Sequence, residues 1–262
     1  MARTTQHRVL NKMLQMLALI LVAYLGLCAA LFVFQRSLIY FPQRFAAPSG
    51  TTTLVVPAEG AHVVATVWPH DGRKALLYFG GNAETVTYSL PGLVAAHPDH
   101  AIYLMNYRGY GGSAGKPSEA ALFADALALF DQVASAHSHV VAMGSSLGSG
   151  VAVYLASQRP VARLVLVTPF DSLQELAASH YRIFPVRWLL QDKFESWRYA
   201  PTVTAPTLVI AAEHDEIIPR ASTEQLHSRF RSGLARYQVI AGAGHNTVSA
   251  SPAYLALLKG VQ

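Results

Sequence analysis

The sequence contains little cysteine and little charge. Cys28 is its single cysteine, which excludes an intramolecular disulfide framework and a cysteine-ligated zinc site. Charged residues make up 13% of the 262 residues and hydrophobic residues 52%, a balance that excludes disordered, collagen-like and coiled-coil chains. The 11 histidines show no H-E-x-x-H or other paired spacing, so we expect neither a metal site nor a cofactor.

Acidic residues are missing from the N-terminal part of the chain. The first carboxylate is Glu59, and five basic residues precede it: Arg3, Arg8, Lys12, Arg36 and Arg44. The remainder holds the other 15 of the 20 basic residues and all 15 acidic ones, so the formal charge of +5 belongs to the N-terminal part alone. Balanced, scattered charge gives no basic stripe that could follow phosphates, and we set nucleic acid aside as a partner.

An apolar run without charge occupies residues 13–34. About 20 such residues cross the hydrocarbon core of a bilayer, and basic residues before the run favour a cytoplasmic N-terminus. We therefore expect residues 1–12 to form a cytoplasmic tail, residues 13–34 a transmembrane signal anchor, and residues 35–262 an exported (periplasmic or extracytoplasmic) domain.

A cleaved secretory signal is the alternative to an anchor. Cys28 and Ala30 are small residues of the kind that precede a cleavage site, although the apolar run continues beyond them.

Two basic residues on the far side of the run, Arg36 and Arg44, count against the expected cytoplasmic position of the N-terminus.

Residues 35–262 alternate short apolar runs with helical patterns. Runs typical of strands occupy residues 53–56, 62–68, 75–79, 101–105, 139–143, 163–167, 207–211 and 237–240. Helical spacing occupies residues 118–137 and 147–158. This alternation predicts one α/β domain with a mostly parallel sheet and helices on both faces. Residues 171–204 interrupt the alternation and are rich in aromatic residues, which indicates a lid insertion.

Residues 144–148 read Gly-Ser-Ser-Leu-Gly, a G-x-S-x-G motif between a strand and a helix. Such a turn needs small flanking residues and presents its serine, here Ser146, at the carboxyl edge of the sheet. The helix that follows offers free N–H groups to a developing oxyanion. The motif therefore predicts that Ser146 is a nucleophile.

A serine nucleophile needs a base and an acid that orients the base, and in this type of fold they follow in the order serine, acid, histidine. Asp215 follows one predicted strand, and His245 follows the next in a loop of small residues. We expect His245 to be the base and Asp215 the acid. Asp171 is the main alternative acid, and Glu213 and Glu216 are two further ones.

The loop after the run at 75–79 contains Gly80, Gly81 and Asn82, where a second oxyanion donor is required. Glycine lets the backbone approach a ligand closely. We expect the backbone N–H groups of Asn82 and Leu147 to form the oxyanion hole. An ordinary glycine turn with Asn82 as a helix cap is an alternative compatible with that role.

These residues resemble the membrane-anchored α/β-hydrolase-domain family, which includes protein depalmitoylases, lysophospholipid lipases and bacterial relatives. The matching segments are residues 35–42 (QRSLIYFP), 80–83 (GGNA), 106–113 (NYRGYGGS), 144–148 (GSSLG), 214–219 (HDEIIP) and 244–246 (GHN). The resemblance implies an α/β-hydrolase fold and a serine hydrolase with Ser146, Asp215 and His245 as its triad. Many relatives have His-Gly before the asparagine, where this chain has Gly80-Gly81.

The expected reaction is hydrolysis of a carboxylic ester or thioester of an acyl or lipid-like substrate. The aromatic lid is expected to contribute an acyl pocket, with Phe170, Phe184, Trp188 and Trp197 as candidate residues. A serine peptidase of the prolyl-oligopeptidase type and a catalytically silent, membrane-tethered binding module are the alternatives. The oligomeric state is left open.

Overall fold

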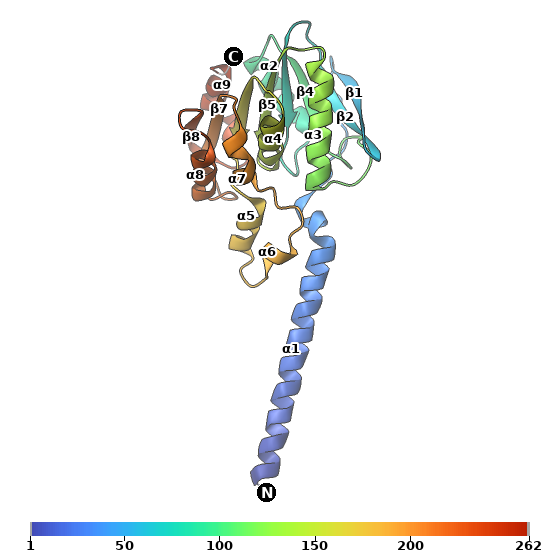
Figure 1. Cartoon of the computed structure of the whole chain (residues 1–262), viewed down its shortest axis with the longest axis vertical. Helices are drawn as coiled ribbons and strands as arrows, with labels where there is room; N and C mark the ends of the chain where they lie inside the picture. Colours follow the sequence, from blue (N-terminus) through green and yellow to red (C-terminus); the bar gives the residue numbers. More distant parts are fainter. Residues whose placement is uncertain (1, 261–262) are drawn as a thin grey trace.

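The computed structural model describes residues 2–260, and within them eight strands form one sheet in the order β1-β2-β4-β3-β5-β6-β7-β8 (Figure 1). The first two strands form an antiparallel hairpin at one edge, and all strands from β3 to β8 run parallel. The bounds are β1 (Thr52–Ala58), β2 (Ala61–Trp68), β3 (Lys74–Phe79), β4 (Ala101–Asn106), β5 (His139–Ser145), β6 (Arg163–Val167), β7 (Thr207–His214) and β8 (Ala235–Gly244).

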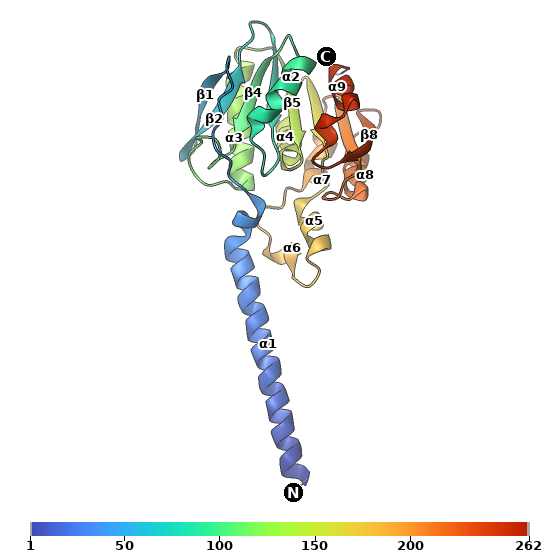
Figure 2. The ribbon, with the colours of Figure 1, turned by 180° about the vertical axis from the view of Figure 1, so that it is seen from behind.

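Helices cover both faces of the sheet, with α3 and α4 on one face and α2 and α9 on the other (Figures 1 and 2). The helices and single turns are α1 (Ala2–Ile39), η1 (Val86–Ser89), α2 (Leu90–Ala96), α3 (Glu119–Ala134), α4 (Leu147–Gln158), α5 (Leu173–His180), α6 (Val186–Leu189), α7 (Ser196–Tyr199), η2 (Ala200–Thr202), α8 (Arg220–Arg229), η3 (Val248–Ala250) and α9 (Pro252–Lys259). The predicted fold class is confirmed.

The central strands are continuous apolar runs because both of their faces are buried. Neighbouring residues of β3 show this, since Leu77 packs into the cluster beneath α3 and α4 and Leu76 into the cluster beneath α2 and α9. Both side chains are fully buried. The sheet is therefore a fixed platform, and its carboxyl edge positions the loops that follow β3, β5, β7 and β8.

The segment between β6 and β7 holds the short helices α5, α6 and α7 where the regular alternation stops. Figure 1 shows α5 and α6 below the carboxyl edge of the sheet, beside the upper part of α1. We call residues 171–204 the lid, the range that the sequence indicates as an insertion.

The N-terminal helix α1 projects away from the domain (Figures 1 and 2). Its stretch His7–Ile39 is long and apolar enough to cross a membrane, and little of that stretch is buried. The helix fits membrane anchoring, and it continues past the expected end of the anchor at Phe34.

Candidate active site

Ser146 occupies a sharp turn between β5 and α4. Its backbone has φ 48° and ψ −116°, a conformation that L residues rarely adopt and that persists only where the surroundings enforce it. The N–H of Ser146 donates to the carbonyl of Val167 over 2.9 Å. Gly144 and Gly148 are required here, because a Cβ on Gly148 would overlap the carbonyl oxygen of Phe79 and a Cβ on Gly144 would overlap that of Gly148.

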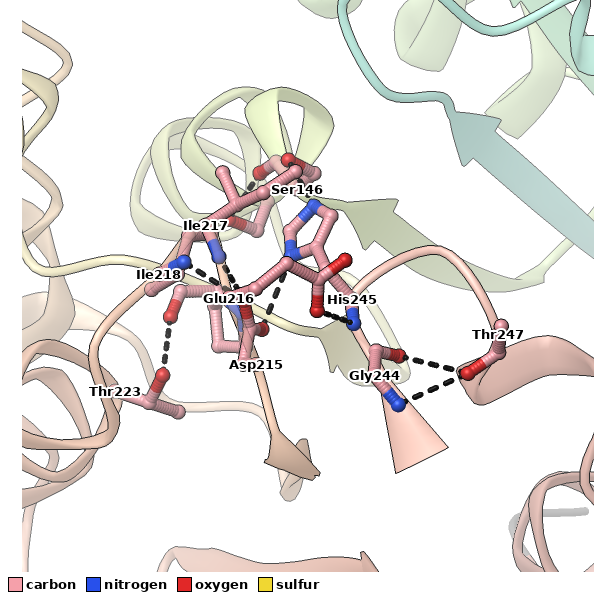
Figure 3. Close-up of polar contacts among 11 residues, drawn as sticks. Ser146, Asp215, Glu216, Ile217, Ile218, Thr223, Gly244, His245 and Thr247 are labelled. Atoms are coloured by element: carbon pink, nitrogen blue, oxygen red, sulfur yellow. Dashed lines mark hydrogen bonds and ion pairs between the residues drawn. The ribbon is translucent and has the colours of Figure 1, made fainter. Parts of the chain in front are cut away.

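His245 lies between Ser146 and Asp215 (Figure 3). Its Nε2 is 3.0 Å from Ser146 Oγ, and its Nδ1 is 3.0 Å from each carboxylate oxygen of Asp215. The side chains of His245 and Asp215 are 7% and 6% exposed, so this contact is shielded from water. Because parallel strands end at the same edge, the loops after β5, β7 and β8 bring these three residues together.

The carboxylate of Asp215 is fixed from its other side by the backbone of its own loop. Asp215 Oδ1 accepts the N–H of Ile217 over 3.0 Å and that of Ile218 over 2.7 Å. These two bonds hold the carboxylate in place beside the imidazole. Asp215 can therefore set the ring orientation and stabilise a charged His245.

The three competing acids make other contacts. Glu216 accepts the backbone N–H of His245 over 3.0 Å, and this bond lowers the pKa of Glu216. Glu213 accepts the N–H of Gly242 over 2.8 Å. Asp171 is buried, which raises its pKa from 3.8 to about 6, and its Oδ1 is without a hydrogen-bond partner. Asp215 is the acid that the structure brings to the imidazole.

The loop of Gly80, Gly81 and Asn82 lies beside Ser146, since a Cβ on Gly81 would be 3.7 Å from the Cβ of Ser146. The side-chain amide of Asn82 donates to the carbonyl of Ile39, at the end of α1, over 3.0 Å. The residue that caps the following turn η1 is Thr85, so the alternative of Asn82 as a helix cap is wrong. The Asn82 side chain instead links this loop to α1.

Glu84 holds the same loop, and the sequence did not reveal it. Its Oε2 accepts the N–H of Gly81 over 2.8 Å, while its Oε1 accepts the hydroxyls of Tyr78 over 2.8 Å and Ser89 over 2.6 Å. A Cβ on Gly80 would lie 2.6 Å from Val86 Cγ1 and 3.0 Å from Glu84 Oε2. The carboxylate thus occupies space beside Gly80. A glutamate three residues after Gly81 was the available signal in the sequence.

A cavity of about 1420 Å³ opens above Ser146 and His245. Its volume exceeds the roughly 300–1,000 Å³ of pockets for drug-sized ligands. Phe170 and Phe184 line it as expected, together with apolar residues of α5 and α6. Trp188 and Trp197 are not among the lining residues, contrary to expectation. Trp188 is 88% exposed, and the Trp197 ring lies against the guanidinium groups of Arg198 and Arg229.

The charged groups that line the cavity are limited in kind. Glu84, Glu216 and histidines are present, and the lining drawn from residues 2–260 includes no lysine or arginine. Within the same residues no cluster of three or more histidine, cysteine, aspartate or glutamate side chains could hold a metal ion. The site offers a serine, an imidazole, carboxylates and backbone N–H groups.

Comparisons with known proteins place the chain among hydrolases. A family model described as serine aminopeptidase, S33, matches residues 76–202. An uncharacterized protein of Mycobacterium tuberculosis is 36% identical over 248 residues, which cover 89% of this chain and 88% of that protein. The lysophosphatidylserine lipase ABHD12 of Xenopus tropicalis is 33% identical over 181 residues, which cover 60% of this chain and 45% of that protein.

A solved structure shares the fold at low sequence identity. The Pyrococcus furiosus esterase Pf2001 superposes with a TM-score of 0.69 at 13% identity, over 85% of this chain and 97% of that one. At 13% identity this similarity supports the fold of the chain and does not indicate its activity.

Proposed function

Because the chain belongs to the α/β-hydrolase family, we propose that it is a serine hydrolase of the esterase, lipase or thioesterase type (EC 3.1), acting on carboxylic esters or thioesters of acyl or lipid-like substrates. The observation that supports this most directly is the continuous contact from Ser146 Oγ through the His245 ring to Asp215, at 3.0 Å on each side. The large apolar cavity above the serine supports an acyl substrate.

The proposed reaction passes through an acyl-enzyme. His245 Nε2 takes the proton of Ser146 as Oγ attacks the carbonyl carbon, and Asp215 stabilises the imidazolium. The backbone N–H groups of Asn82 and Leu147 receive the oxyanion. The tetrahedral intermediate collapses, and His245 returns the proton to the departing alcohol or thiol. Water, deprotonated by His245, then releases the acid and restores Ser146.

The proposed setting of this reaction is a membrane surface. Residues 13–34 would cross the bilayer once with the tail of residues 1–12 in the cytoplasm, and the domain of residues 35–262 would lie on the opposite side. The apolar stretch of α1 and the basic residues before it support this topology.

A serine peptidase is the second candidate, because the matching family model is described as a serine aminopeptidase. An aminopeptidase would need a free carboxylate for the substrate's terminal ammonium group. Both oxygens of Glu84 already accept hydrogen bonds, from Gly81, Tyr78 and Ser89. Glu216, which also lines the cavity, accepts the N–H of His245 through Oε2 and is therefore the carboxylate that would take this role in a peptidase.

Labelling by a fluorophosphonate probe and hydrolysis of acyl esters of graded chain length test the proposal together. The unchanged chain should be labelled and should hydrolyse esters, and Ser146→Ala should do neither. Ser157→Ala, at the far end of α4, is the matched control and should behave as the unchanged chain. Labelling of Ser146→Ala would refute the assignment. Neither labelling nor turnover by the unchanged chain would favour the binding module, and turnover of peptides alone would favour the peptidase.

A further inference from the structure

One face of the anchor helix α1 forms part of the cavity wall. Leu27, Leu31, Gln35, Leu38 and Ile39 line the cavity. Their spacing places them on a single side of the helix, since residues three and four apart share a face. From Leu27 to Ile39 this face runs along about 18 Å of helix axis at 1.5 Å per residue. Leu27 and Leu38 are half or more exposed, like other residues of this projecting helix.

The lid is fastened to the C-terminal end of α1 and to the residue that follows it. Arg36 donates to the buried Asp192 through Nε at 3.0 Å and Nη2 at 3.3 Å, and Tyr40 donates its hydroxyl to the same carboxylate over 3.0 Å. Gln35 donates to the carbonyl of Leu189 and accepts the N–H of Gln191. These bonds fix the distance between α1 and α6, so the gap between them is a built feature of the fold.

The tip of the lid reaches the apolar part of α1. The Tyr24 hydroxyl donates to the carbonyl of Ile183 over 2.7 Å, and the Tyr24 ring stacks on Phe184 with centroids 6.0 Å apart. Tyr24 belongs to the middle of the apolar run. Ile183 and Trp188 of the lid are 75% and 88% exposed, as expected of side chains that face lipid. Residues 183–184 of the lid therefore lie beside the apolar stretch of α1 that we expect to cross the membrane.

We propose that the gap between α1 and the lid is the binding site for the acyl chain of a lipid drawn directly from the adjacent leaflet, with Leu27 and Leu31 as its wall. This assignment rests on the proposed function. Its support is an apolar surface that continues from the helix into the cavity at Ser146 and His245, a lining without lysine or arginine, and a volume of about 1420 Å³. An acyl chain that follows this surface from the bilayer reaches Ser146 without contacting water. Its transfer therefore avoids the free-energy cost of exposing apolar surface to water.

The test uses the full chain in phosphatidylcholine vesicles with umbelliferyl butanoate and umbelliferyl palmitate as probes. Leu31→Trp fills the gap, whereas Val33→Trp places the same side chain on the outward side of the same helix, where Val33 is 69% exposed. We expect Leu31→Trp to lower the palmitate-to-butanoate rate ratio by about tenfold or more, the scale at which hydrophobic pockets discriminate against a misfit. Val33→Trp should leave the ratio unchanged.

Fluorophosphonate labelling of each variant shows whether it is folded, and Leu27→Trp replaces Leu31→Trp if the latter is not labelled. An equal ratio in the Leu31 and Val33 variants would overturn the acyl-chain site while butanoate turnover and labelling still support the serine hydrolase. The absence of turnover of either ester and of labelling in the unchanged chain would overturn both proposals.

Discussion

Glu84→Gln tests whether the carboxylate of Glu84 positions the loop of Gly80, Gly81 and Asn82, in which we expect an oxyanion donor. The change keeps the size of the side chain and removes its charge, which weakens the 2.8 Å bond from the Gly81 N–H and the two hydroxyl bonds of the other oxygen. Hydrogen bonds to charged groups contribute about 1.5–3 kcal/mol, which corresponds to a rate factor of about 10 to 100. Removal of a whole oxyanion donor costs about 10²- to 10³-fold and sets the upper limit.

The measured quantities are kcat, KM, the pH–rate profile and the melting temperature with a short acyl ester. We expect kcat to fall about 10- to 100-fold with little change in KM, because the loop acts on the tetrahedral state and not on the bound ester. The shape of the pH–rate profile should stay the same, because the change leaves the contacts among Ser146, His245 and Asp215 in place. Asp131→Asn, which breaks the exposed pair with Arg159 far from the cavity, is the control and should alter stability by less than about 1 kcal/mol. An unchanged kcat in both Glu84→Gln and Glu84→Ala would refute the positioning role.

Three further predictions concern Asp215, the turn that holds Ser146, and Asp171. Asp215→Asn should lower kcat about 10⁴-fold with the fold intact, and a loss below tenfold would contradict its role. Gly148→Ala should destabilise the chain by about 1–3 kcal/mol or more in thermal melting, because its Cβ meets the backbone of β3, whereas Gly92→Ala, with open space around it, should be neutral or stabilising. The raised pKa of Asp171, about 6 against 3.8, means that the folded chain binds its proton more tightly than the unfolded chain. The free energy of unfolding should therefore fall by about 3 kcal/mol as pH rises from about 4 to about 6. Asp171→Asn should remove that fall with kcat little changed, and an identical pH dependence in this variant would refute the reasoning.

The fold was readable from the sequence because its central strands are buried on both faces. Residues 75–79 are apolar throughout and so are residues 164–167 of the run 163–167, and β3 and β6 occupy those positions. The meeting of Ser146, Asp215 and His245 was readable for a related reason. Each follows a parallel strand, and parallel strands end at one edge of the sheet. Their catalytic roles stay predictions.

Contacts that depend on how separate elements dock were not readable. Glu84 belongs to the site only because the turn after β3 folds its carboxylate back to Gly81. Trp188 and Trp197 were grouped with the acyl pocket because of their residue type, but composition does not indicate which side of a short helix faces the cavity. The apolar pattern of α1 predicted a membrane helix and gave no sign that Leu31 would line the same cavity as Ser146.

The wall that α1 contributes to the cavity has a practical consequence for preparing this protein. A chain that begins at residue 35, or one cleaved after Ala30, would lack Leu27 of the cavity wall. It would also lack the Tyr24 ring that stacks on Phe184. Its cavity would open to solvent on that side and present apolar lid residues to water. This shortened form would expose an apolar surface that detergents and neighbouring molecules can bind, so its preference among esters would reflect the opened pocket and not the pocket of the full chain.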